Sequence, residues 1–140
     1  MSNDRTAEEW GRVAVGLPGF RWMPGMAGYN ADGPFRVDAV DGRVPCKVSI
    51  CQWSGERQLL DIRCGPIPNP DDPATAGCLL ELLGWPGVIN RTGSLLVVLV
   101  AAPGHPAADD DGYVRGRGTD LGRAGIAAAE KLGRWPGGEG

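Results

Sequence analysis

Residues 95–102 read Leu95-Leu96-Val97-Val98-Leu99-Val100-Ala101-Ala102, an apolar run with no polar residue at alternate positions. Thr92-Gly93 precedes the run, Pro103-Gly104 follows it, and three valines lie in its middle. This length and composition are typical of a strand that is covered on both faces, and the run is too short to cross a bilayer. We therefore expect it to form the central strand of a sheet with helices on both faces.

Three helices are predicted before and after this strand. The first extends from a capping-box pattern, Thr6 with Glu9, to Pro18-Gly19, and an apolar stripe follows its length. The second covers residues 71–84, where aspartate and proline at the start and glycine at the end are the usual helix signals. The third covers residues 119–133, with a threonine as the expected N-cap and many small residues that permit close approach to the sheet.

Alternating apolar and polar residues predict three antiparallel strands, over residues 35–39, 44–51 and 60–64. A short strand at residues 88–90 precedes the apolar run. The predicted element order is therefore α-β-β-β-α-β-β-α. We expect an α+β fold with three helices and a mainly antiparallel sheet of about five strands. A chain of this length usually forms one domain, so we expect a single domain over residues 1–140.

The composition is that of an ordinary soluble protein, with 42% hydrophobic and 22% charged residues. A formal net charge of −3 argues against a protein that coats nucleic acid or binds a membrane surface. The polar start, Met1-Ser2-Asn3-Asp4-Arg5, contains no apolar signal core, and the sequence shows no membrane span. These features predict a cytoplasmic protein.

The chain has a single histidine, His105, and four cysteines: Cys46, Cys51, Cys64 and Cys78. The cysteines lack the C-x2-C spacing of a zinc site. Cys46 and Cys64 share predicted strand faces with apolar residues, so we expect them, together with Cys78, to be buried and reduced. The aspartate run at residues 109–111 lacks the spacing of a calcium loop. We therefore expect no metal and no cofactor.

A glycine- and proline-rich segment over residues 18–34 carries five large side chains: Phe20, Trp22, Met23, Met26 and Tyr29. Two interpretations are open. The segment can fold back over the edge of the core, since tryptophan and methionine often cover small sheets. Alternatively, the five side chains can form an exposed apolar patch that binds a protein partner.

Arginines precede the third predicted helix and lie in its first turn, and a candidate anion site consists of Arg115, Arg117, Thr119 and Arg123. Backbone amides, the helix dipole and guanidinium groups could together hold an anion or a nucleic-acid phosphate there. The alternative is that these arginines pair with the aspartates at residues 109–111 on the surface.

Motifs of enzymatic chemistry are missing from the sequence. There is no G-x-S-x-G nucleophile motif, no Walker motif and no dinucleotide fingerprint. His105 lies between proline and glycine residues, a poor place for a positioned general base. The sequence therefore assigns no catalytic residue, and an enzyme is the third of the hypotheses that we consider.

Three segments resemble the phage ABA sandwich domain, which occurs in small proteins of tailed phages and prophages. They are residues 10–24, with Leu17-Pro18-Gly19 and Arg21-Trp22-Met23-Pro24, the helix entry at residues 71–84, and the closing Gly116-Arg117-Gly118-Thr119-Asp120-Leu121-Gly122-Arg123-Ala124. The resemblance implies an α-β-α sandwich and a phage origin, hence the cytoplasm of a bacterial host. It implies no activity, so it transfers no catalytic residue to this chain.

These observations lead to one main hypothesis and one alternative from another class. The main hypothesis is a non-catalytic phage accessory protein that binds a host or phage protein, host-defence proteins included. The alternative is an anion- or nucleic-acid-binding protein that uses the arginines before the last helix. The sequence names no partner, predicts no membrane contact and leaves the oligomeric state open.

Overall fold

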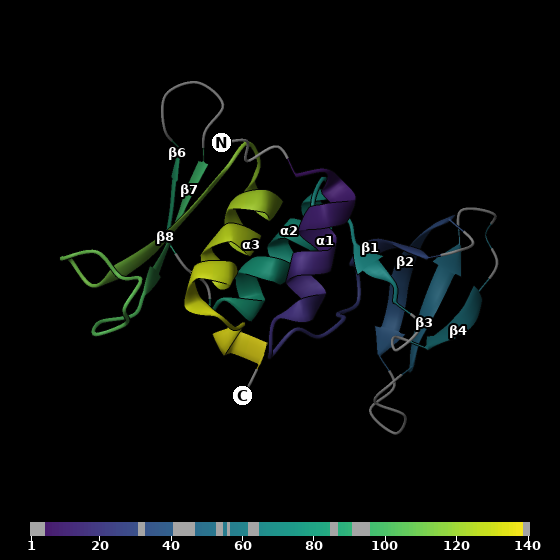
Figure 1. Cartoon of the computed structure of the whole chain (residues 1–140). Coiled ribbons are helices and arrows are strands. Elements are labelled where there is room, and N and C mark those ends of the chain that lie inside the picture. Colours follow the sequence, from purple (N-terminus) through teal and green to yellow (C-terminus); the bar gives the residue numbers. More distant parts are fainter. Residues whose placement is uncertain are drawn as a thin grey trace.

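The computed structural model describes residues 5–30, 33–40, 47–52, 55, 57–61, 65–84, 87–90 and 96–138. Within these residues the chain forms three α-helices and eight strands (Figure 1). The helices are α1 (Ala7–Gly16), α2 (Pro73–Leu82) and α3 (Leu121–Leu132), and a short 3-10 helix, η2 (Pro136–Gly138), follows α3.

Five strands form an antiparallel sheet in the order β4-β3-β2-β1-β5, which we call sheet A. Its strands are β1 (Ala27–Asn30), β2 (Gly33–Val40), β3 (Lys47–Gln52), β4 (Arg57–Asp61) and β5 (Ile67–Pro68). The three strands predicted from alternation correspond to β2, β3 and β4, and each pairs with the next in an antiparallel register. The ends of the predicted ranges at residues 44–46 and 62–64 lie outside the described residues.

Strands β1 and β5 were not predicted. They pair through Gly28 with Pro68 and through Tyr29 with Ile67. A Cβ at Gly28 would lie 2.6 Å from the Ile67 carbonyl oxygen and 2.8 Å from the Trp22 ring, so only glycine permits this approach. Both strands are short, and β1 lacks the regular alternation that identifies a strand from sequence.

Three further strands form a second antiparallel sheet, sheet B, in the order β6-β7-β8. They are β6 (Gly87–Asn90), β7 (Leu96–Ala101) and β8 (Tyr113–Gly118). The apolar run forms β7, which is a central strand as expected; its first residue, Leu95, lies outside the described residues. Helix α3 packs on one face of sheet B, where Val98 and Val100 join the core.

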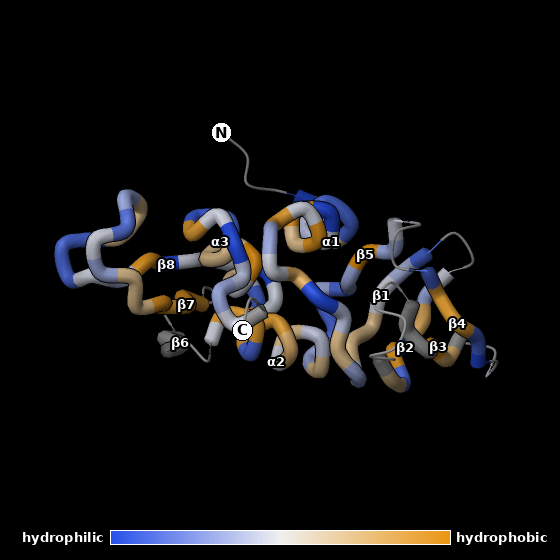
Figure 2. Tube along the Cα trace, turned by 90° about the horizontal axis from the view of Figure 1, so that it is seen from below, coloured by the Kyte–Doolittle hydropathy of each residue, from blue (hydrophilic) through white to orange (hydrophobic). Residues whose placement is uncertain are grey.

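The helices lie between the two sheets, with sheet A and sheet B at opposite ends of the molecule (Figures 1 and 2). The α+β class, the three helices and an antiparallel five-stranded sheet are confirmed. The expectation of a single sheet is corrected, because eight described strands divide between two sheets. The expectation of helices on both faces of β7 is also corrected, since α3 is the helix that packs on this strand in the described part.

The helix starts follow the local chemistry of capping. The Thr6 hydroxyl accepts a hydrogen bond from the Glu9 amide at 3.1 Å, and the Glu9 carboxylate accepts one from the Thr6 amide at 3.1 Å. Helix α2 begins after Asp72, as predicted. Helix α3 begins one residue later than expected, because the carboxylate of Asp120 and not the hydroxyl of Thr119 accepts from the Arg123 amide.

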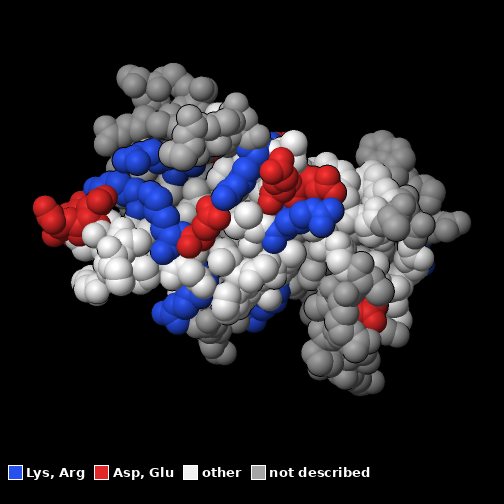
Figure 3. All heavy atoms as spheres, in the orientation of Figure 1, with Lys and Arg blue, Asp and Glu red and all other residues white. Residues whose placement is uncertain are grey.

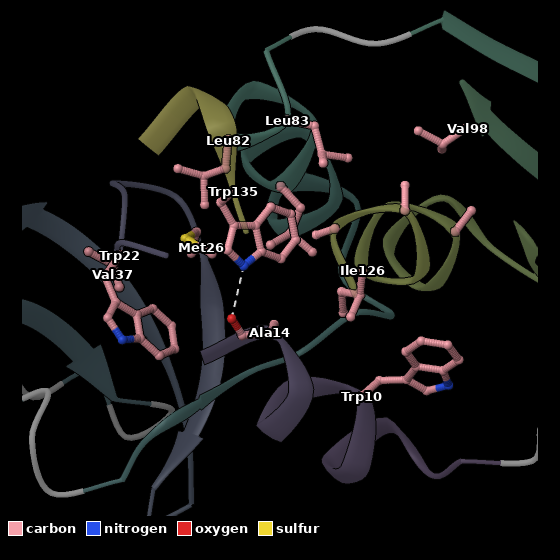
Figure 4. Packing of buried hydrophobic residues seen from close by; sticks show 14 of the residues in the cluster. Trp10, Ala14, Trp22, Met26, Val37, Leu82, Leu83, Val98, Ile126 and Trp135 are labelled. Atoms are coloured by element: carbon pink, nitrogen blue, oxygen red, sulfur yellow. Dashed lines mark hydrogen bonds between the residues drawn. The ribbon is translucent and has the colours of Figure 1, made fainter. Parts of the chain in front are cut away.

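The hydrophobic core contains buried residues from both sheets and from all three helices (Figure 4). Trp135 lies among them with no exposed surface, although the sequence had suggested only a glycine-rich tail there. Its indole nitrogen donates to the Ala14 carbonyl at 2.9 Å, and its backbone amide donates to the Pro18 carbonyl at 2.8 Å. The segment after α3 therefore holds the end of α1 against the core through these two hydrogen bonds.

Candidate functional site

The five large side chains of residues 18–34 do not form one exposed patch. Trp22 is 5% exposed and Met26 is fully buried, while Phe20 and Met23 are half-buried. The Trp22 ring centroid lies 5.6 Å from that of Phe20 and 5.5 Å from that of the core residue Phe35. Tyr29 alone of the five is exposed, at 36%. The interpretation as core cover agrees with this burial, and Trp22 and Met26 are inaccessible to a partner.

The structure also separates the four residues of the candidate anion site. Residues 115–118 belong to strand β8 and not to a loop before α3. Because Gly116 and Gly118 face α3, the neighbouring Arg115 and Arg117 point to the opposite face of sheet B. Arg123 lies on α3, and Thr119 is exposed between the two elements. The four side chains therefore do not converge on one place.

Carboxylates neutralise two of these arginines. Arg115 donates to Asp109 and, at 2.6 Å, to Asp111, and these bonds raise the pKa of Arg115 and hold the pKa of Asp111 below its ordinary value. Arg123 pairs with Asp71 and Asp120, and Asp120 also caps α3. The arrangement at Arg115 is the surface pairing that we named as the alternative. Acidic and basic side chains likewise lie side by side over α1 and α3 (Figure 3).

A polar network that runs from the exposed Arg36 to the buried Thr75 connects α2 to sheet A. Arg36 donates to Asp72 at 2.9 Å and to the Gly25 carbonyl at 2.7 Å. Asp72 accepts from the Thr75 amide at 3.0 Å, and the fully buried Thr75 hydroxyl accepts from the Ala27 amide at 2.7 Å. Each polar group in the network has a partner, and the network positions α2 against β1 and β2, so we assign it a structural role.

The Arg36 hydrogen bond lowers the pKa of Asp72 from its ordinary value of 3.8. The unfolded chain therefore takes up this proton at a higher pH than the folded chain does, and stability that is present above pH 3.8 is lost as the pH falls further. We expect Asp72→Asn, which keeps a capping side chain, to reduce stability at neutral pH by at most about 1 kcal/mol. The difference between wild type and variant should shrink below about pH 4 in urea unfolding. A difference that grows toward low pH would contradict this assignment.

His105 has a structural role in the described structure. Its Nδ1 accepts from the Ala107 amide at 3.0 Å, and its Nε2 lies 3.2 Å from the Leu132 carbonyl oxygen at the end of α3. Both ring nitrogens therefore contact backbone groups, and the ring connects the loop after β7 to the end of α3. An open hollow of about 440 Å³ lies beside this ring, with Pro103 and Arg134 in its wall. Among the described residues, no nucleophilic side chain forms a hydrogen bond with either nitrogen of this ring.

Cys51 and Cys78, the cysteines among the described residues, are half-buried free thiols, so the expectation that Cys78 is buried is corrected. Burial, and then the negative charges of Glu81 and Asp72, raise the pKa of the Cys78 thiol, so this thiol is a weak nucleophile. Its sulfur lies 3.9 Å from the Pro24 carbonyl oxygen. Cys46 and Cys64 lie outside the described residues, so their predicted burial is not tested. Within the described ranges no three His, Cys, Asp or Glu side chains are close enough to hold a metal ion.

One surface combines apolar, aromatic and basic side chains away from the helices. We call it the outer face of sheet B, and its accessible side chains are Leu99, Tyr113, Arg115 and Arg117; Val97 points to the same side of the sheet but is buried. Arg115 and Arg117 lie opposite Leu99 and Val97 in the β7–β8 register. Val97 is buried and Leu99 half-buried, whereas Tyr113 is 40% exposed and Arg117 is exposed. Sequence reasoning missed this surface because it assigned Arg115 and Arg117 to a helix entry.

Comparison with protein-family models, with curated proteins and with solved structures finds no match for this chain. The resemblance to the phage ABA sandwich domain therefore stays a prediction. None of the helices in the described part of the chain combines the length and the apolar character that a membrane span needs.

Proposed function

We propose that this chain is a non-catalytic protein-binding module and that it binds through the outer face of sheet B. The observation that carries the proposal is the placement of exposed Tyr113 and Arg117 around half-buried Leu99, on the face that α3 does not cover. Tyrosine and arginine are enriched among the residues that dominate protein interfaces, and the apolar centre of such a surface excludes water.

The charges of this face indicate the chemistry of the partner. Arg117 is exposed and makes no ion pair with a described carboxylate, whereas Arg115 is held by Asp109 and Asp111. A partner surface with apolar side chains beside a carboxylate would fit Leu99, Tyr113 and Arg117 together. Because Arg115 is already fixed in place, the face loses little side-chain freedom on binding.

The biological setting is part of the proposal. The resemblance to phage proteins supports an accessory role in the bacterial cytoplasm, with a host or phage protein as the partner. Anion or nucleic-acid binding receives less support, because Arg115 and Arg123 are paired with carboxylates and the formal net charge is −3.

We expect the double variant Tyr113→Ala with Arg117→Glu to bind the partner at least about tenfold more weakly than wild type, since two central contacts are removed. Immobilised wild type and variant would be incubated with extract of phage-infected bacteria, and retained proteins would be compared by mass spectrometry. A protein retained by wild type would then be purified, and its dissociation constant measured against both chains.

Arg12→Glu is the matched control, because Arg12 is an exposed arginine on α1, far from sheet B, and makes only a surface pair with Glu8. It should bind as wild type does. Equal binding by wild type and the double variant would rule out this face. Retention of nucleic acid that weakens steeply with salt, and that disappears in Arg117→Glu, would replace protein binding by the alternative function.

A further inference from the structure

Strand β4 forms one edge of sheet A among the described strands. β4 is the terminal strand of the order β4-β3-β2-β1-β5, and no described strand pairs with its other edge (Figure 1). The edge of a sheet presents unpaired backbone amides and carbonyls that can pair with another strand. Leu59, in the middle of β4, is 64% exposed, which is the largest value among the exposed large hydrophobic residues of the described chain.

The five residues of β4 are complementary to themselves in the antiparallel direction. β4 reads Arg57-Gln58-Leu59-Leu60-Asp61. Suppose that a second copy pairs with β4 about a two-fold axis at Leu59. Leu59 of one copy then lies opposite Leu59 of the other, and Arg57 of each copy lies opposite Asp61 of the other.

The side chains concerned point to one face of the sheet. Ile50 and Leu60 contribute to the core, and Ile50 lies opposite Gln58 in the β3–β4 register. Arg57, Leu59 and Asp61 alternate with these positions and therefore share the face away from the core. A two-fold axis perpendicular to the sheet keeps this face common to both copies, so opposite charges flank an apolar pair on one surface.

We propose that two copies of this chain associate by antiparallel pairing of β4 with β4, which joins the two A sheets into one continuous sheet. The strand that pairs with this edge comes from a second copy of the chain. In the register that uses all five residues of β4, each arginine lies opposite an aspartate of the other copy. Arg57 is 78% exposed in its pair with Asp38, at 3.3 Å, and it can reach across the axis; Asp61 keeps an interaction within its own chain. This inference is independent of the proposed function, which concerns sheet B at the other end of the molecule.

A pairing over five residues buries little surface, so we expect a weak dimer whose population rises with concentration. Sedimentation equilibrium of the full chain over a roughly hundredfold concentration range would give the dissociation constant. Arg57→Asp alone and Asp61→Arg alone each place like charges opposite each other, and each should raise the dissociation constant at least about tenfold. The double variant with both changes restores opposite charges and should dimerise within about threefold of wild type.

An equal mixture of the two single variants is the sharpest arm of the test. In the mixed dimer the new carboxylate at position 57 faces the new guanidinium at position 61, and both native charges also face opposite partners. The mixture should therefore dimerise more strongly than either variant alone. Melting curves check that each variant is folded, and Leu59→Lys, which places two ammonium groups at the axis, is a second disruptive change at an exposed position.

Three results would overturn the proposal. They are a wild type that stays monomeric at the highest concentration, a dimer that is unaffected by both single changes and by Leu59→Lys, or a mixture no stronger than its components. Loss of partner binding in the sheet B variant would leave these outcomes unchanged, so failure of one proposal is distinguishable from failure of the other.

Discussion

Replacing Trp135 by alanine is expected to destabilise the protein by about 3–5 kcal/mol, the usual loss when a buried aromatic side chain is removed. Trp135 has no exposed surface and lies between α1 and α2, with its ring centroid 6.2 Å from that of Phe20. The change also removes the indole donor to the Ala14 carbonyl, which keeps only the longer hydrogen bond from the Leu17 amide, at 3.4 Å. Urea unfolding followed by circular dichroism would measure the difference.

Trp135→Phe is the matched control, because it keeps an aromatic ring and removes the indole N–H. We expect a loss of about 1–3 kcal/mol, between wild type and the alanine variant, from the lost indole hydrogen bond to the Ala14 carbonyl and from the smaller ring. If Trp135→Ala melts within about 2 °C of wild type, the role of residues after α3 in the core is refuted.

Gly116→Ala is expected to weaken the contact between α3 and sheet B, although it adds only a methyl group. A Cβ at Gly116 would lie 2.3 Å from the Ala124 carbonyl oxygen and 2.3 Å from the Ala128 nitrogen. Both are backbone atoms of α3, so the helix itself must move away from β8. We expect a loss at the upper end of about 1–3 kcal/mol, the range of overpacked cores, measured by urea unfolding.

Gly77→Ala provides the contrasting substitution within a helix. Gly77 lies in α2, and an added Cβ would meet nothing within 4 Å. We expect this change to stabilise the protein by about 0.5–1 kcal/mol, because alanine loses less backbone freedom in a helix. Opposite signs for the two glycine-to-alanine changes would establish that contact with α3, and not glycine as such, decides the effect at position 116. Equal signs would contradict the close packing of β8 on α3.

Local patterns in the sequence determined most of the secondary structure. The capping box at Thr6, the Asp72-Pro73 helix start and the alternation in β2 to β4 all act over a few residues, and each appears in the structure as predicted. The apolar run forms a buried strand, which its short length, its β-branched centre and the turn residues on either side favoured over a buried helix segment. The α+β class follows from these elements alone.

Tertiary packing decided the features that the sequence could not indicate. Strands β1 and β5 exist because Gly28 admits the Ile67 backbone, and this contact joins segments that are far apart in the chain. Trp135 enters the core only because the Ala14 carbonyl and the Phe20 ring lie beside it. No local window contains such pairs.

The same limit applied to the candidate sites. Glycines at positions 116 and 118 suggested a flexible entry to a helix, whereas their contact with α3 makes residues 113–118 a strand and turns Arg115 and Arg117 to the outer face of sheet B. For Trp22 and Met26 the sequence left surface and core open, although it favoured the core, and both lie in the core, where the Trp22 ring contacts that of Phe35. Which arginines and aromatic residues reach solvent was thus set by the packing of elements distant in sequence, because burial depends on all of a residue's neighbours.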